Sequence, residues 1–358
     1  MLFITQDQLS AWLGRLAAER ALIAPVQAQP DLLLYQPVSD SDAIVYDFTR
    51  PAISPKEFFL PATEALLTIE RVRQVAAGEA EGAAQPDWQV RLSEPPPGRD
   101  QVLFGLRPCD SHALLALDAL LLKDPVDAPY ARRRAQTTLI GLACREMGPS
   151  CFCTGLDFTP DDCAGMDLML YPVDGGYALA GGGPDGCLTE KGQALLAGMA
   201  LADYGGPSPW HNWPQTLPAQ VPPRPVWEEA FNDPYWSALA DRCLSCKICS
   251  YVCPTCRCFD VRDAVIPRAA GDPQGAGYQK IERLRCWDSC MSDGYRRIAG
   301  GHNPRAATAQ RLRNRFYCKF DYYPADFGPL GCVGCGRCID LCPVNVDITE
   351  VIAEVVRR

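Results

Sequence analysis

Apolar residues near the N-terminus recur with the period of an α-helix. Leu9, Trp12, Leu13 and Leu16 fall at positions i, i+3, i+4 and i+7, and the preceding segment 5–8 has the form of a capping box. We therefore expect an amphipathic first helix. Two short strands should follow, at 22–26 and 32–36, whereas prolines at 51, 55 and 61 predict an irregular segment over 48–70.

Two continuous apolar runs, 102–106 and 137–143, are typical of buried strands. Residues 111–122 lie between them with helical spacing, and Asp110 is the expected N-cap. The order strand, helix, strand predicts a right-handed βαβ unit, in which both strands end at the edge where ligands usually bind. Segments 167–171 and 177–180 flank a turn sequence and predict a hairpin.

The pattern of apolar and polar positions changes after residue 205, where prolines become frequent. Seven prolines occur between 205 and 225, so this stretch should be extended, and we place a domain boundary there. The alternative is an ordered strap with Trp210 and Trp213 packed onto the first domain. A helix should start after Asp233, with Pro234 as its first residue. The stripe of apolar residues over 348–357, capped by Asp347, predicts a final helix that packs back on the preceding region.

Length and composition narrow the class of protein. The 358 residues are enough for two domains, and the net charge of −9 argues against nucleic acid as the main partner. The N-terminus lacks the form of a signal peptide, and no apolar stretch is long enough to span a membrane. Nineteen cysteines in a chain of this size, an odd number, favour a reducing cytoplasmic location over a disulfide framework.

The cysteines repeat one pattern. Residues 243–254 and 332–343 both have the form C-x2-C-x2-C-x3-C-P, the bacterial ferredoxin run. In that arrangement three thiolates of one run and the fourth of the other close each [4Fe–4S] cluster. We therefore predict one cluster held by Cys243, Cys246, Cys249 and Cys342, and a second held by Cys332, Cys335, Cys338 and Cys253.

A pair of zinc ribbons is the alternative, but zinc sites usually take two pairs of cysteines, whereas each run here supplies four and a trailing proline. The expected fold class is an α+β or α/β N-terminal domain followed by a helical two-cluster ferredoxin-type domain with a long insertion between its runs. The expected domains are 1–205 and 226–358, joined by a proline-rich linker at 206–225. After Cys258 we expect coil.

Four more cysteines follow the ends of the predicted βαβ strands. Cys109 and Cys144 come directly after the two strands, and Cys151 and Cys153 lie just downstream. Four thiols on loops at one edge of a sheet suggest a third iron–sulfur cluster. Two alternatives stay open: these are ordinary buried cysteines, or Cys163 or Cys187 replaces one of the four.

The segment from Lys280 to Lys319 carries ten Lys or Arg and three Asp or Glu, a net charge of +7. Its arginines could stabilise anionic clusters, form a solvated helix face or dock an acidic partner subunit; they are Arg283, Arg285, Arg296, Arg297, Arg311, Arg313 and Arg315. Structural burial is the simplest role for the remaining cysteines: Cys256, Cys258, Cys286, Cys290 and Cys318.

As a set, these motifs resemble one family: the iron–sulfur beta subunit of soluble sulfhydrogenase-type [NiFe] hydrogenases and its close counterpart, the iron–sulfur subunit of anaerobic sulfite reductases. The resemblance is carried by segments along nearly the whole chain: 54–57, 60–64, 105–110, 151–155, 253–256, 287–290 and 331–338.

The resemblance implies a non-catalytic electron-transfer subunit, which sits between a diaphorase-type subunit that binds FAD and NAD(P) and a terminal catalytic subunit. Consistently, the chain has no G-x-G-x-x-G motif in a strand–helix context, and its three histidines make a proton relay difficult. His112, beside Cys109, is expected to cap or pack. One alternative is an iron–sulfur subunit of a heterodisulfide-reductase-like complex with its own substrate site; another is a redox sensor that switches through the remaining cysteines.

Overall fold

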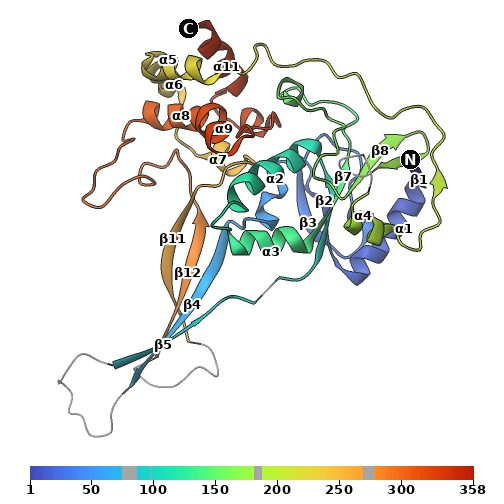
Figure 1. Cartoon of the computed structure of the whole chain (residues 1–358), viewed down its shortest axis with the longest axis horizontal. Helices are drawn as coiled ribbons and strands as arrows, with labels where there is room; N and C mark the ends of the chain where they lie inside the picture. The colour runs from blue at the N-terminus through green and yellow to red at the C-terminus, as the bar shows by residue number, and fades with distance from the viewer. Residues whose placement is uncertain (75–86, 97, 181–187, 269–277) are drawn as a thin grey trace.

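The computed structural model describes residues 1–74, 87–96, 98–180, 188–268 and 278–358. Cys187, one of the candidate replacements in the third site, lies outside these residues. Figure 1 shows a sheet with helices on both faces, a group of short helices near the C-terminus, and a second sheet that reaches away from both as an arm.

The larger sheet has the strand order β10-β1-β9-β8-β7-β6-β2-β3. Its strands are β1 (Leu2–Thr5), β2 (Ala21–Gln29), β3 (Leu32–Val38), β6 (Gln101–Leu106), β7 (Thr137–Leu142), β8 (Leu168–Val173), β9 (Gly176–Ala180) and β10 (Ala202–Asp203). The central neighbours β2, β6, β7 and β8 are parallel, and the outer pairs are antiparallel. The predicted strands at 102–106 and 137–143 are therefore central, and the expected mixed α/β class is confirmed for this part of the chain.

Helices cover both faces of this sheet. They include α1 (Gln6–Glu19), α2 (Pro108–Leu121), α3 (Ala128–Gln136) and α4 (Glu190–Leu196). α1 and α4 share one apolar core with alternate residues of β2, β6 and β7, while α2 and α3 pack on the opposite face. The predicted capping box of α1 is present, since Thr5 and Gln8 bond each other's backbone N–H. The expected N-cap at Asp110 is wrong: α2 begins at Pro108, whose fixed φ suits a first helical position.

The C-terminal helices surround a second core. They are α5 (Arg224–Glu229), α6 (Tyr235–Arg242), α7 (Ile248–Tyr251), α8 (Thr308–Tyr317), α9 (Tyr323–Phe327), α10 (Arg337–Asp340) and α11 (Ile348–Arg357). The final helix has the predicted bounds, and its buried stripe shares a core with Cys335 and with aromatic side chains of α8. α6 starts one residue later than expected, at Tyr235, whose N–H bonds the Asp233 carboxylate.

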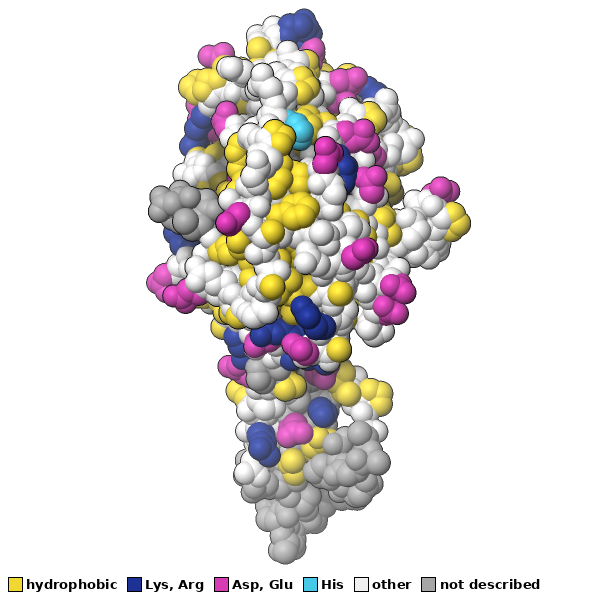
Figure 2. All heavy atoms as spheres, turned by 90° about the vertical axis from the view of Figure 1, so that its right-hand side faces the viewer, with side chains coloured by type: hydrophobic (Ala, Val, Ile, Leu, Met, Phe, Trp, Pro, Cys, Tyr) yellow, Lys and Arg dark blue, Asp and Glu magenta, His cyan; other side chains and the backbone are white. Residues whose placement is uncertain are grey.

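The arm is an antiparallel sheet of order β11-β12-β4-β5. Its strands are β4 (Thr63–Gln74), β5 (Asp87–Ser93), β11 (Phe259–Ile266) and β12 (Tyr278–Trp287). Two expectations are therefore wrong: residues 63–70 are strand rather than irregular, and the segment after Cys258 is strand rather than coil. Ladder hydrogen bonds between β4 and β12, which lie more than 200 residues apart in sequence, hold this sheet together. Figure 2 shows charged side chains of both signs where the arm meets the rest of the molecule.

The proline-rich segment runs along the right-hand side and top of the molecule in Figure 1, and that right-hand side faces the viewer in Figure 2, where apolar side chains gather. Trp210 packs edge-on against Tyr171 of β8, with ring centroids 4.3 Å apart, and the His211 N–H donates to Asp161. These are contacts of an ordered strap. The division into domains at 206–225 stays a prediction.

Candidate metal centre

The two cysteine runs share one backbone conformation. Ser245 and Lys247 of the first run have positive φ values of 52° and 70°, and Gly334 and Gly336 occupy the same places in the second run with 59° and 74°. Each run then enters a short helix, α7 or α10, that carries its third cysteine. The repeat in the sequence is thus also a repeat in structure, and it curves three cysteines around one side of a hollow.

The first hollow brings together the four cysteines of site 1: Cys243, Cys246, Cys249 and Cys342. It contains about 510 Å³ of space, part of it open to solvent, and apolar side chains of α8 and α11 form its inner wall. Two backbone N–H groups point at its sulfurs, from Ser245 to Cys243 at 3.4 Å and from Val346 to Cys342 at 3.2 Å. Such N–H donors stabilise thiolates that hold a cluster.

Site 2 consists of Cys253, Cys332, Cys335 and Cys338, and it lies deeper. Cys253 and Cys335 are 7% and 8% exposed, whereas Cys246 of site 1 is exposed. Burial raises the pKa of Cys332 to about 11, although the nearby Lys319 ammonium acts in the opposite direction. In the unliganded protein the Cys332 thiol is therefore protonated at neutral pH, and metal binding has to displace its proton.

Two buried cations face the thiols of both sites. The Lys319 ammonium donates to the Cys253 sulfur at 3.2 Å and to the Gly331 carbonyl at 2.9 Å. Burial acts to lower the pKa of Lys319, but the thiolate charges of Cys253 and Cys256 raise it well above its ordinary value. Burial likewise acts to lower the pKa of Arg315, which the thiolates of both runs, Cys249 and Cys338 first, raise in the same way. Of the seven arginines that the sequence analysis singled out, Arg315 lies near thiols of both runs.

The third predicted set also comes together. Cys109, Cys144, Cys151 and Cys153 line a hollow of about 360 Å³ at the carboxyl ends of β6 and β7, and we refer to them as site 3. The Arg50 guanidinium donates to the Cys151 sulfur at 3.0 Å. Burial raises the pKa of Cys144 to about 11 and that of Cys153 to about 12. Cys163 lies beside Tyr171 in a different core, so the structure does not place it at this hollow.

The second run connects the three sites. Cys335 belongs to site 2 and also lines the hollow of site 3, and Cys338 of site 2 also lines the hollow of site 1. The sites therefore lie in a row, with site 2 in the middle. The thiols of sites 1 and 3 surround hollows. Within the parts of the chain that the structure describes, no three His, Cys, Asp or Glu side chains are placed to hold a single metal ion. Cubane clusters suit such an arrangement because their thiolates are spread around a volume.

A buried ion pair holds the second run against α2. The Arg337 guanidinium donates to the Asp110 carboxylate at 2.7 Å, with both side chains at most 1% exposed. Tyr35 donates to the same carboxylate, and Arg107 donates to the Leu142 and Ala143 carbonyls at the end of β7. The segment 107–110 thus fixes Cys109 relative to both the sheet and the second run.

Residues of the segments 54–57 and 60–64 likewise hold distant parts of the chain together. Lys56 donates to the Cys253 and Cys256 carbonyls at 3.1 and 3.0 Å, and Glu64 pairs with Arg285 at the base of the arm.

His112 stacks on Phe158 and bonds Asp162, which is the packing role expected for it. Sequence reasoning missed Lys56 and Lys319 as neighbours of the thiols, because a lysine far away in sequence gives no local signal.

Comparison with known proteins agrees with this geometry. Residues 242–346 match the 4Fe-4S dicluster domain. The chain is 29% identical to Sulfhydrogenase 2 subunit beta of Pyrococcus furiosus over 329 residues, which cover 90% of this chain and 88% of that protein. The chain is a homologue of this beta subunit. No solved structure matches the chain significantly.

The resemblance to a sulfhydrogenase beta subunit that the sequence predicted is therefore confirmed. The dicluster domain covers both ferredoxin runs and the segment between them, so it supports iron–sulfur clusters and an electron-transfer role. The assignment of individual cysteines to clusters, and the number of clusters, stay predictions. None of the described helices is both long and apolar enough to cross a bilayer.

Proposed function

We propose that this chain is the electron-transfer subunit of an oxidoreductase complex and carries three [4Fe–4S] clusters. When bound, these clusters supply one-electron carriers between a subunit that binds FAD and NAD(P) and a terminal catalytic subunit of hydrogenase or sulfite-reductase type. The name of the relative, a subunit of a sulfhydrogenase, supports a complex with partner subunits. The observation that carries the proposal is the row of three thiol sets joined by Cys335 and Cys338.

The protein's own residues suit this role in two ways. The row is reachable at both ends: Leu244 beside site 1 is 64% exposed, and Arg145 and Glu146 beside site 3 are exposed. Its middle is buried and receives Lys319 and Arg315 as counter-charges. A buried middle with accessible ends lets two different partners exchange electrons with one subunit while water is kept from the centre.

The iron content of the anaerobically purified chain tests the number of clusters. We expect about twelve iron and twelve sulfide atoms per chain, because each cubane contributes four of each. The Cys144→Ser variant should lose about four of the twelve iron atoms, since it removes one thiol of site 3. Cys163→Ser is the matched control and should keep the full content. A wild-type value of about eight, the content of two cubanes, would contradict the third cluster.

The partner subunits are tested by purifying the native complex and analysing its cofactors. FAD together with nickel would identify the hydrogenase branch, and FAD together with siroheme the sulfite-reductase branch. If the isolated chain turned over a substrate with an artificial electron donor, the relay proposal would be wrong and the chain would have a substrate site of its own.

A further inference from the structure

Two cysteines outside the three sites lie together at the base of the arm. Cys258 directly precedes β11, and Cys290 follows the end of β12 by three residues. The β11–β12 ladder continues to this point, because the Asp288 N–H donates to the Cys258 carbonyl at 2.9 Å, one rung beyond the pair Phe259 and Trp287. The ladder thus places Cys258 opposite Asp288, two residues before Cys290, and each of the two thiols is the neighbour that most affects the pKa of the other.

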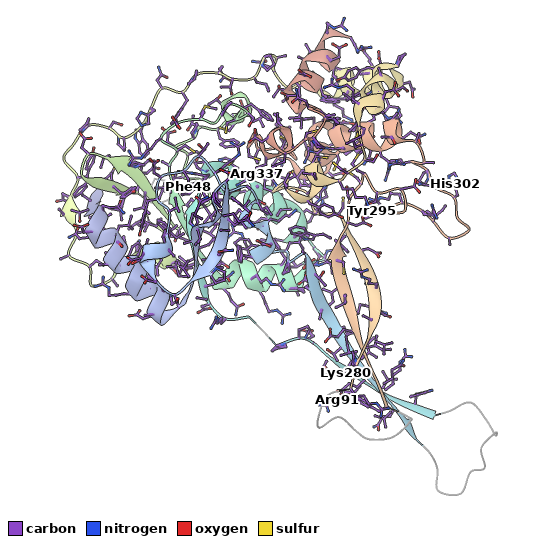
Figure 3. The ribbon with its side chains drawn as sticks, turned by 180° about the vertical axis from the view of Figure 1, so that it is seen from behind. Phe48, Arg91, Lys280, Tyr295, His302 and Arg337 are labelled. Atoms are coloured by element: carbon purple, nitrogen blue, oxygen red, sulfur yellow. The ribbon has the colours of Figure 1, made fainter. Side chains whose placement is uncertain are left out.

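The surroundings shift the pKa values of the two thiols in opposite directions. The hydrogen bond from Cys290 is the largest cause that lowers the pKa of Cys258 to about 6, and the Tyr295 hydroxyl and the charges of Arg257 and Arg296 act in the same direction. That same hydrogen bond, together with burial, raises the pKa of Cys290. Figure 3 labels Tyr295 where the arm joins the rest of the molecule. One thiolate beside one protonated thiol is the arrangement of an attacking and a resolving cysteine.

A metal site is a poorer match for these contacts. The charged side chains that affect Cys258 most are Arg257 and Arg296, and neither guanidinium can serve as a metal ligand. The nearby thiol of Cys256 faces Cys253 and receives Lys319 at 3.7 Å. The pair therefore has two sulfurs and cationic neighbours, which suits a reactive thiolate better than a ligand set.

We propose that Cys258 and Cys290 form a redox-active dithiol that exchanges with low-molecular-weight disulfides. The Cys258 thiolate attacks one sulfur of the small disulfide, whose S–S bond breaks and releases one small thiolate. Cys290 then gives up its proton, and its sulfur attacks Cys258 in the mixed disulfide and releases the second small thiol. Two protein thiols are oxidised to one disulfide and one small disulfide is reduced to two thiols, so atoms and electrons balance.

The location gives the exchange a structural consequence. A Cys258–Cys290 bond would covalently join the ends of β11 and β12 where the arm leaves the cluster-binding part of the chain. Lys56 lies at the same junction, with its ammonium 3.9 Å from the centre of the Trp287 ring. The proposal does not depend on the relay function, because its readout is a covalent bond.

The test treats the full-length holoprotein anaerobically with mixtures of reduced and oxidised glutathione, followed by acid quenching, alkylation and trypsin. Cleavage after Arg257 and Arg285 releases peptides 258–262 and 286–296. We expect these two peptides to become disulfide-linked as the mixture becomes more oxidising, and to separate again in reduced glutathione, with unchanged iron content.

Three variants give the test its controls. Cys258→Ser should abolish the link, and Cys290→Ser should leave a stable glutathione adduct on Cys258, because the resolving thiol is missing. Cys286→Ser, which removes the other cysteine of the second peptide, should keep the link. Absence of the linked peptide in wild type at every mixture would overturn the proposal. Loss of iron from Cys258→Ser or Cys290→Ser would also overturn it, since it would identify the pair as cluster ligands.

Discussion

Lysine 319 is a buried cation in direct contact with a thiol. Its side chain donates to the Cys253 sulfur and is 4% exposed. A cation buried this deeply is stable only beside compensating negative charge, and the Cys253 thiolate supplies it, because a hydrogen bond from Cys256 and the charge of Lys319 hold the pKa of Cys253 well below its ordinary value. Lys319 therefore has two effects at once: it stabilises the anionic site and it raises the affinity of that site for an added electron.

The variant Lys319→Met should accordingly lower the midpoint potential of the cluster at site 2. About 1 kcal/mol of lost hydrogen-bond energy in the reduced state corresponds to about 40 mV for one electron. A redox titration followed by EPR measures the shift. Lys280→Met is the control: Figure 3 labels Lys280 on the arm, so this substitution should leave every midpoint in place. An unchanged potential in Lys319→Met would mean that Lys319 has only a packing role.

The Asp110–Arg337 pair leads to a second prediction at this scale. Asp110→Asn should reduce the free energy of unfolding by about 3 kcal/mol, because it leaves the Arg337 guanidinium buried without a counter-charge. Anaerobic urea unfolding measures the change. Asp47→Asn is the control: the Asp47 side chain is 88% exposed, so we expect a change below about 0.5 kcal/mol. Equal effects of the two substitutions would show that the buried pair contributes no more than a surface charge.

At the scale of elements, the two cysteine runs differ in what surrounds the same backbone. A Cβ on Gly334 would lie 2.5 Å from the Cys153 backbone nitrogen, while the Phe152 N–H already donates to the Gly334 carbonyl at 2.8 Å. Ser245 occupies the equivalent place in the first run with a side chain present. Glycine is thus required in the second run by the close approach of the segment 151–153, which joins site 2 to site 3.

We therefore predict that Gly334→Ala separates these two segments. It should reduce the free energy of unfolding by about 2 kcal/mol or more and lower the iron content, because the backbone contact at Cys153 has to break. Iron analysis and urea unfolding measure the two effects. Ser245→Ala, at the equivalent place of the first run, keeps a Cβ that is already accommodated and should be close to neutral. Retention of full iron content in Gly334→Ala would argue against this role of the contact.

How well each element could be predicted depended on how local its signal is. Four elements were predicted close to their true positions: α1, α11, β6 and β7. Their signals, an apolar stripe or an apolar run, lie within a single short segment of the sequence. The arm was missed because β4 carries charged residues such as Glu64 and Glu70 and pairs with β12 more than 200 residues later. No pattern within either segment indicates that β4 and β12 pair.

At the scale of the whole molecule, the sheet and the C-terminal helices meet at the second cysteine run. The convergence of the site 3 cysteines followed from a general rule, because parallel strands end at one edge of a sheet. The position of that edge beside Cys335 could not be predicted, since it depends on the Asp110–Arg337 pair and on the Gly334 approach, both between segments far apart in sequence. The motifs predicted which cysteines lie together, but the order of the sites along the row came from tertiary structure.

Because each of the two runs supplies ligands to both sites, the order in which the chain is synthesised determines when each cluster can be loaded. On the proposed assignment, site 1 needs Cys342 and site 2 needs three cysteines after residue 331, whereas every cysteine of site 3 has been synthesised by residue 153. While the chain is still attached to the ribosome, the assembly machinery for iron–sulfur clusters thus finds a full complement of ligands only for the N-terminal cubane. The other two must be loaded after nearly the whole chain has been made.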